Sequence, residues 1–184
     1  MANTYLTRTQ SAGNRRTFTI SVWVKRSTPS ARQSIISASV DGNNETYMWL
    51  NSTDKLSIRE SHSNSSDFVL QTNRLFRDVN AWYHIVLAVD TTQATASNRV
   101  KVYVNGVQET SFESGQETYP SQNYETRFNN NSQVVEIGRH LSGYPYPFDG
   151  VMSHFHFVDG TAYAPTVFGS TDSTTGEWKI NTSP

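Results

Sequence analysis

The sequence predicts an all-β fold, a two-sheet antiparallel β-sandwich. Apolar and polar residues alternate in several short segments, as they do in strands that bury one face. Polar, turn-rich stretches such as residues 51–54 and 61–66 separate these segments at intervals of about 8–12 residues. No segment carries a long helical stripe, so we expect at most one turn of helix, after Pro165.

Three segments predict strands most clearly. Apolar residues occupy every second position from Phe18 to Val24, from Tyr83 to Val89 and from Val100 to Val104. Successive side chains of a strand point to opposite faces, so one face of each segment is predicted to be buried. The predicted core residues are Phe18, Ile20, Val22, Ile85, Leu87, Val102, Val104 and Phe155.

The dipeptide Asn105-Gly106 follows the third segment and predicts a hairpin. Both residue types tolerate positive φ, which a two-residue type I′ turn requires. We therefore expect residues 99–105 and 107–110 to pair as the two strands of that hairpin.

Weaker alternation predicts six further strands, at residues 34–40, 47–50, 55–60, 68–72, 134–138 and 151–158. Two stretches break the alternation. Ser111–Ser132 is long and polar, and Arg139–Asp149 is rich in proline and aromatic residues. Long loops are usually functional, and recognition commonly lies on the loops of a rigid sandwich, so we expect partners to bind at these two stretches.

The composition fits one globular domain over residues 1–184. Hydrophobic residues make up 35% of the chain and aromatic residues 12%, which is enough to bury a core. The formal net charge of −1 gives no reason to expect binding to nucleic acid or to an anionic membrane. No run approaches the roughly 18 apolar residues that a membrane span needs.

The chain contains no cysteine, so disulfides cannot hold the fold, which argues against a eukaryotic secreted module. Its first residues, Met1-Ala2-Asn3-Thr4-Tyr5, lack the basic start and the apolar run of a secretory signal. If the domain acts outside a cell, we expect it to get there by a route other than secretion.

Four motifs follow one another along the chain: residues 17–25, residues 81–87 with Trp82 and His84, the run Val102-Tyr103-Val104-Asn105-Gly106, and the closing pair Ile137-Gly138 and Phe148-Asp149-Gly150-Val151-Met152. Their order and spacing resemble those of laminin-G-like and pentraxin-like domains. The resemblance covers Phe18 to Phe157. It implies a concanavalin-A-like jelly roll.

The C-terminal part carries a narrower pattern. Residues 155–163, then Phe168-Gly169, then Thr175-Gly176-Glu177-Trp178-Lys179, resemble the tail of laminin-G-like domains in bacteriophage virion proteins. The resemblance implies a place in the virion, outside the cell after host lysis, with other virion subunits as partners in a homo-oligomer. It leaves open whether the chain continues beyond Pro184.

The sequence lacks the motifs of glycan hydrolases that share this fold, so we expect no enzymatic activity and no catalytic residues. Glycoside hydrolysis needs two carboxylates about 5–9.5 Å apart, which on a strand means acids at alternate positions. No Glu-x-Asp-x-Glu run exists, and the strand acids Glu60, Asp90 and Glu136 are isolated. The Gly-x-Ser-x-Gly elbow of serine hydrolases is also missing.

Asp41, Asn43 and Asn44 are the candidate metal ligands. They supply oxygen atoms in a tight loop, which Ca²⁺ prefers, and the resemblance to pentraxin-like domains implies an Asp-Asn calcium pair here. Those domains add acids where this chain has Arg139-His140-Leu141, and a basic residue would oppose a cation. We therefore favour a plain hydrophilic turn and expect no cofactor, with calcium as the alternative.

His154 and His156 lie two residues apart on a predicted strand and would share one face. Two histidines can hold a transition metal. No third ligand is evident nearby, so we favour an exposed polar face.

The candidate ligand-binding residues are aromatic side chains on the two irregular stretches, namely Tyr119, Tyr124, Tyr144, Tyr146 and Phe148. An aromatic ring combines an apolar face with a polar edge, which suits the mixed surface of a sugar. The alternative is that these rings pack the loops onto the sandwich or onto a neighbouring subunit.

These observations favour a non-enzymatic domain of a phage tail fibre or other virion surface appendage, which binds a host-surface glycan or mediates assembly of the appendage. One alternative is a purely structural protein that decorates a capsid or builds a fibre. The other is a bacterial cell-surface adhesin domain.

Overall fold

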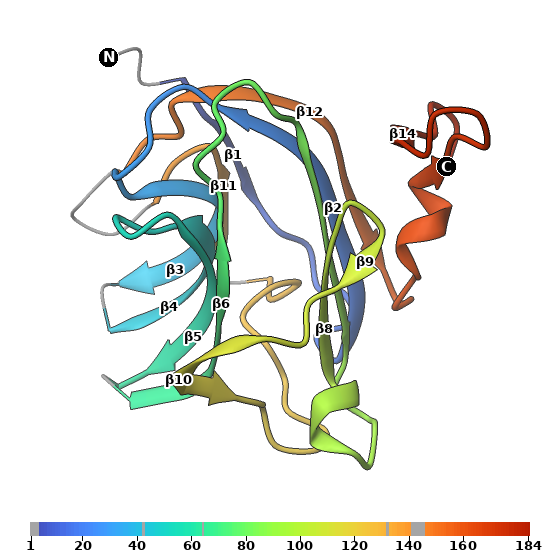
Figure 1. Cartoon of the computed structure of the whole chain (residues 1–184). Helices are drawn as coiled ribbons and strands as arrows, with labels where there is room; N and C mark the ends of the chain where they lie inside the picture. The colour runs from blue at the N-terminus through green and yellow to red at the C-terminus, as the bar shows by residue number, and fades with distance from the viewer. Residues whose placement is uncertain (1–3, 42, 64, 132, 141–145) are drawn as a thin grey trace.

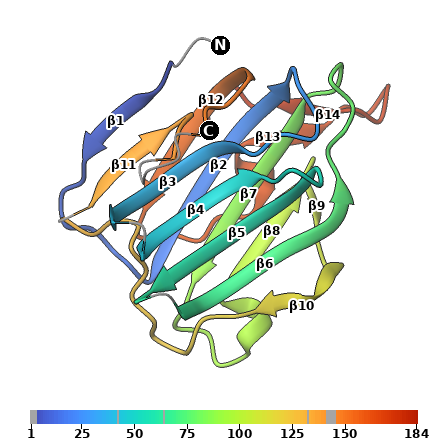
Figure 2. The same cartoon turned by 90° about the vertical axis from the view of Figure 1, so that its left-hand side faces the viewer.

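The computed structural model describes residues 4–41, 43–63, 65–131, 133–140 and 146–184. Two antiparallel sheets face each other in these residues (Figure 1). The larger sheet, seen face-on in Figure 2, has the strand order β1-β11-β3-β4-β5-β6-β10. Its strands are β1 (Leu6–Thr9), β3 (Gln33–Asp41), β4 (Asn44–Leu50), β5 (Lys55–His62), β6 (Ser65–Leu75), β10 (Phe112–Thr118) and β11 (Val134–Ile137).

The smaller sheet has the order β12-β2-β7-β8-β9. Its strands are β2 (Thr17–Arg26), β7 (Tyr83–Asp90), β8 (Val100–Val104), β9 (Val107–Gln108) and β12 (Gly150–Asp159). Two turns of 3-10 helix, η1 (Ala96–Asn98) and η2 (Pro165–Val167), and a separate hairpin of β13 (Gly169–Thr171) and β14 (Trp178–Ile180) complete the described structure. The predicted helical turn after Pro165 is confirmed, and η1 is a second turn that the sequence pattern did not predict. None of the helices in the described ranges has the length and apolar character needed to cross a membrane.

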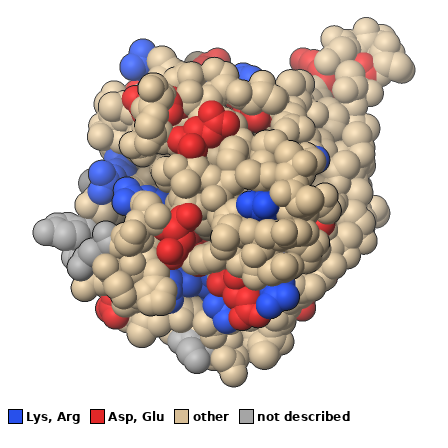
Figure 3. Space-filling view, turned by 90° about the horizontal axis from the view of Figure 1, so that it is seen from below, with Lys and Arg blue, Asp and Glu red and all other residues tan. Residues whose placement is uncertain are grey.

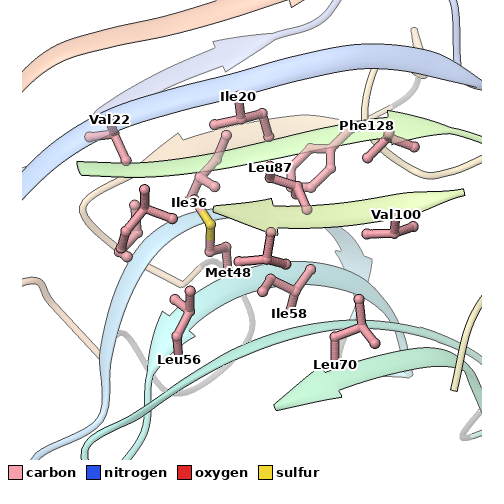
Figure 4. Packing of buried hydrophobic residues seen from close by; sticks show 14 of the residues in the cluster. Ile20, Val22, Ile36, Met48, Leu56, Ile58, Leu70, Leu87, Val100 and Phe128 are labelled. Atoms are coloured by element: carbon pink, nitrogen blue, oxygen red, sulfur yellow. The ribbon is translucent and has the colours of Figure 1, made fainter. Parts of the chain in front are cut away.

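The core lies between the two sheets and follows the alternation in the sequence. Ile20 of β2 is paired with Leu87 of β7, which in turn is paired with Val102 of β8, so these side chains share the inner face. Figure 4 shows Ile20 and Leu87 packed together with Ile58 from the opposite sheet. Seven of the eight predicted core residues are at most 2% exposed, and Phe155 is partly buried against the same cluster.

The predicted hairpin at Asn105-Gly106 is confirmed. Both residues have positive φ, 49° and 80°, and they join β8 to β9. The turn is also anchored to β7, because the backbone N–H of His84 donates to Asn105 Oδ1 at 2.7 Å and the Asn105 N–H donates to the His84 carbonyl at 2.8 Å.

One prediction about irregular structure is wrong. Ser111–Ser132 is not a continuous loop, because Phe112–Thr118 forms the edge strand β10. This strand has no clean alternation, and its register against β6 shifts between Phe112 and Glu117. A bulge interrupts the pairing of β12 with β2 between Ser153 and His156, with His154 at φ 46°. His154 and His156 nevertheless both lie on the outer side of the sheet, where His156 contacts Phe168 and His154 lies beside a cleft lined by Trp23.

The C-terminal segment lies against the outer face of the smaller sheet (Figure 1). Phe168 contacts His156 of β12, with ring centroids 5.5 Å apart, and Trp178 contacts His84 of β7. The outer face of the smaller sheet is therefore partly covered by the chain's own C-terminal hairpin.

Candidate functional site: a tryptophan-lined cleft

Three of the four tryptophans of the chain line one cleft of about 730 Å³. Trp23 comes from β2, Trp82 immediately precedes β7, and Trp178 begins β14. The other lining residues are Asn105, Ser153, His154, Glu177, Lys179 and Ile180. The cleft thus lies on the outer face of the smaller sheet, between that sheet and the C-terminal hairpin.

His84 organises this site, although it is itself fully buried. It is paired with Trp23 across β7 and β2, on the face opposite to the core residues Val22 and Ile85. Its ring lies nearly parallel to Trp23, with centroids 4.8 Å apart, and to Trp178, with centroids 6.0 Å apart. The imidazole therefore stacks on Trp23, and it lies nearly coplanar with Trp178, edge to edge.

Hydrogen bonds fix the protonation of His84. Trp178 Nε1 donates to His84 Nδ1 at 2.9 Å, so the ring proton lies on Nε2, which is 2.9 Å from Ser21 Oγ. Burial, and secondly the proximity of His156, lowers the pKa of His84 to about 4. The imidazole is thus neutral at pH 7 and able to accept the indole proton.

Two glycines allow Trp178 to dock. A Cβ atom on Gly106 would lie 2.5 Å from the Trp178 ring, and one on Gly169 would lie 2.6 Å from it. Gly106 also has the positive φ that the β8–β9 turn requires. The turn predicted from Asn105-Gly106 is therefore also the surface on which the third tryptophan rests.

The cleft keeps aromatic surface within reach of a ligand. Trp82 is 39% exposed, and Trp23 and Trp178 are partly exposed. Trp23 Nε1 is buried, so Trp23 offers a ligand the face of its ring and not its N–H group. Apolar walls with a few polar groups at the rim are typical of small-molecule sites.

The polar rim carries one carboxylate. Among the described lining residues only Glu177 is acidic, and it is exposed. Lys179 pairs with Asp172 at 2.6 Å, so its charge is compensated within the hairpin. Asn105 uses its Oδ1 for His84, which leaves the amide Nδ2 at the rim as a donor.

The predicted binding residues on the first irregular stretch are packed locally. Tyr119 is partly buried against the core cluster, and its hydroxyl donates to Glu117 at 3.1 Å. The Tyr124 hydroxyl lies 2.8 Å from both Glu60 Oε1 and Asp67 Oδ2. Neither residue lines the tryptophan cleft.

Glu60 is therefore not isolated, although its sequence position suggested that it was. Its carboxyl is fully buried and also accepts the backbone N–H of Arg127 at 3.1 Å. Burial raises the pKa of Glu60 to about 7. One hydroxyl proton cannot bond two carboxylates, so a proton on Glu60 completes its contact with Tyr124. No substrate can reach this carboxyl, because it has no exposed surface.

The predicted residues on the second stretch divide into three cases. Tyr144 lies outside the described residues. Phe148 is partly buried against the core cluster. Tyr146 meets the edge of Trp49 with ring centroids 5.8 Å apart, and its hydroxyl accepts a hydrogen bond from Arg32 at 3.1 Å. The two described residues thus contact the sandwich itself.

The candidate metal ligands Asp41, Asn43 and Asn44 are close together, but nitrogen donors face the carboxylate. Asp41 accepts from the Asn43 backbone at 2.9 Å and from Asn44 Nδ2 at 3.0 Å. Asn44 Oδ1 accepts from Arg127 at 3.1 Å. Within the described residues, no three His, Cys, Asp or Glu side chains are arranged to hold a metal ion. The favoured hydrophilic turn fits this arrangement.

Charge does not mark out a different site on the end of the sandwich seen from below. There, acidic and basic side chains alternate over a mostly uncharged surface (Figure 3). The tryptophan-lined cleft, which gathers three indole rings beside an open volume, is the candidate site. Local sequence pattern does not predict this cleft, because its tryptophans come from positions 23, 82 and 178; each lies in a separate motif, and nothing in the sequence brings the three together.

The chain matches the family Laminin_G_3, of the concanavalin A-like lectin/glucanases superfamily, over residues 2–168. This match covers most of the chain, so the chain belongs to that superfamily, and the predicted concanavalin-A-like fold is confirmed. A search of curated proteins found no match.

Solved structures share the fold at low sequence identity. A heptameric SAP-like pentraxin from Limulus polyphemus has a TM-score of 0.61 at 15% identity, covering 96% of this chain and 85% of the pentraxin. The CBM40 domain of Ruminococcus gnavus IT-sialidase, bound to α2,3-sialyllactose, has a TM-score of 0.59 at 15% identity, covering 83% of this chain and 90% of that domain.

A third similar structure is tailspike protein 2 of the Escherichia coli O157:H7 bacteriophage CAB120, with a TM-score of 0.55 at 10% identity. The match covers 89% of this chain but only 22% of the tailspike, so this chain corresponds to a small part of that protein.

Proposed function

We propose that this member of the concanavalin A-like lectin/glucanases superfamily is a non-enzymatic glycan-binding domain, and that the glycan binds in the tryptophan-lined cleft. The observation that carries the proposal is the convergence of Trp23, Trp82 and Trp178, from distant parts of the chain, on one open cleft. Indole faces bind the apolar faces of sugar rings, and polar groups at the rim bind the hydroxyls.

The absence of catalysis is part of this proposal. Glycoside hydrolysis requires two carboxyl groups about 5–9.5 Å apart across the scissile bond. The described lining of the cleft supplies the single carboxylate of Glu177. Glu60 and Asp67 are bridged by the Tyr124 hydroxyl, and Glu60 is fully buried.

We further propose that the domain belongs to a virion surface appendage, where it binds a host-surface glycan and packs against other virion subunits as a homo-oligomer. The motifs in the C-terminal segment and the similarity to part of a phage tailspike support this setting. The open cleft favours binding over a purely structural role.

A glycan array tests the function directly. The unmodified domain should bind a subset of glycans, and Trp82→Ala should reduce binding to those glycans about fivefold or more, since stacking on one exposed ring contributes on the order of 1 kcal/mol or more. Val107→Ala is the matched control, because Val107 is 63% exposed on β9 and does not line the cleft.

Mass spectrometry of the bound glycans after prolonged incubation tests the second half of the proposal. We expect the glycans to be recovered intact. Absence of binding across the array would contradict glycan recognition, and shortened glycans would contradict the non-enzymatic assignment.

A further inference from the structure

The wall of the cleft formed by β14 lies outside the part of the chain that matches the superfamily. The match ends at residue 168, whereas Glu177, Trp178 and Lys179 follow it. The sandwich supplies Trp23 and Trp82 as one side of the cleft, and the hairpin supplies the other. The hairpin thus follows the matched part of the chain and completes the cleft.

The hairpin is held rigidly enough to present its side chains in a defined position. Trp178 is fixed by its hydrogen bond to buried His84 and by close packing on Gly106 and Gly169. Lys179 is tied to Asp172 across the same hairpin at 2.6 Å. Trp178 is therefore anchored, and it positions the preceding residue, Glu177, at the rim of the cleft.

The charge balance of the rim is negative. Asp172 compensates Lys179, whereas no ion pair to the exposed Glu177 carboxylate occurs among the described residues. Asn105 contributes an uncharged amide donor from the opposite side. A carboxylate accepts hydrogen bonds from sugar hydroxyls and repels a second carboxylate placed beside it.

We propose that β14 is the specificity-determining wall of the cleft, and that Glu177 makes the site select uncharged sugars over sugars that carry a carboxylate, such as sialic and uronic acids. This inference rests on the proposed glycan-binding function. It assigns to Glu177 a role in choosing the ligand, and to Trp178 the role of fixing where Glu177 lies.

Paired probes test the selection. Each uncharged glycan bound on the array is compared with its sialylated or uronic counterpart by titration calorimetry at low ionic strength. The unmodified domain should prefer the uncharged partner by about tenfold or more, as expected for a like charge next to the ligand. Glu177→Gln should reduce that preference to within about threefold, and Glu177→Lys should reverse it.

Two controls keep the result interpretable. Glu117→Gln removes an exposed carboxylate on β10 that does not line the cleft, and it should leave the preference unchanged. High ionic strength should weaken the preference in the unmodified domain, because salt screens exposed charges.

Failure of the Glu177 selection and failure of the proposed glycan-binding function give different results. If the domain binds glycans in a Trp82-dependent way but Glu177→Gln leaves the preference unchanged, the selection by Glu177 is wrong and the proposed function stands. If the unmodified domain prefers carboxylated sugars, the selection by Glu177 is also wrong, and the proposed function again stands. If no glycan binds, or Trp82→Ala has no effect, the proposed site itself fails.

Discussion

Each sheet carries an aromatic cluster on its outer face, and the two clusters are covered differently. On the larger sheet, Tyr47 and Trp49 stack with ring centroids 3.6 Å apart and are only 4% and 8% exposed. The Arg32 guanidinium lies over Trp49 at 4.5 Å and over Tyr146 at 4.8 Å. These rings already have partners within the chain.

On the smaller sheet, Trp23 and Trp178 both contact His84, and Trp82 remains 39% exposed. The chain's own hairpin forms a wall here and leaves a cleft instead of filling the space. Aromatic content alone therefore does not identify a binding site. What distinguishes the second cluster is unfilled volume beside its rings.

The largest expected effect is on stability at the first cluster. Trp49→Ala should lower the free energy of unfolding by about 3–5 kcal/mol, because it removes a buried ring that its neighbours cannot replace. Trp82→Ala should cost clearly less than Trp49→Ala, since Trp82 is 39% exposed. Denaturant melts of both variants measure the contrast, and equal costs would contradict it.

The second prediction uses pH. Neutral His84 has a pKa lowered from 6.5 to about 4, so its stabilising contribution is complete above pH 6.5 and is lost as pH falls through 4. Glu60 has a pKa raised from 4.5 to about 7, so its contribution is complete below pH 4.5 and is lost as pH rises through 7. Each contribution is on the order of 3 kcal/mol.

Between pH 4.5 and 6.5 the two groups change the free energy of unfolding in opposite directions as pH rises. Their effects therefore nearly cancel in the unmodified domain. Single variants separate them. The stability difference between the unmodified domain and His84→Gln should shrink on acidification, and the difference for Glu60→Gln should shrink as pH rises. Unfolding curves from pH 4 to pH 8 check this, and slopes of the same sign would show that one of the two protonation states is wrong.

An intermediate effect is expected at the turn beneath Trp178. Gly106→Val places a β-branched residue at φ 80° and a Cβ atom 2.5 Å from the indole. The strain should cost about 1–3 kcal/mol and displace Trp178 from His84. Near-ultraviolet circular dichroism reports the displacement. A variant with native stability and an unchanged tryptophan signal would mean that Trp178 does not rest on this turn.

The smallest effect is expected from metal removal. The Asp41 carboxylate accepts hydrogen bonds from Asn43 and Asn44, so the loop is held without an ion. EDTA should leave the melting temperature nearly unchanged. A large drop that Ca²⁺ restores would instead assign Asp41, Asn43 and Asn44 as ligands.

Most of the sandwich is predictable from local pattern. Alternation identifies β2, β7 and β8, and Asn105-Gly106 identifies the turn after β8, because both signals depend only on neighbouring residues. The edge strands β1 and β10 are not predictable in this way. Each pairs on one side only and buries little, so selection for an apolar face is weak.

The candidate site depends on contacts that local pattern does not contain. Tyr124 looks like an exposed loop aromatic until β5 places Glu60 beside its hydroxyl. Trp178 looks like part of a polar tail until the hairpin carries it to His84, 94 positions earlier in the chain. Pairings at that separation are set by tertiary structure.

Glycan binding by two single variants tests the central claim most directly. Trp82→Ala and Tyr146→Ala are compared with the unmodified domain by titration calorimetry, using a glycan that the unmodified domain binds, and each variant is melted in parallel. We expect Trp82→Ala to lose binding with its stability retained, and Tyr146→Ala to retain binding, since Tyr146 does not line the cleft. Loss of binding in Tyr146→Ala with native stability, while Trp82→Ala binds normally, would place the site on the loop and contradict the cleft.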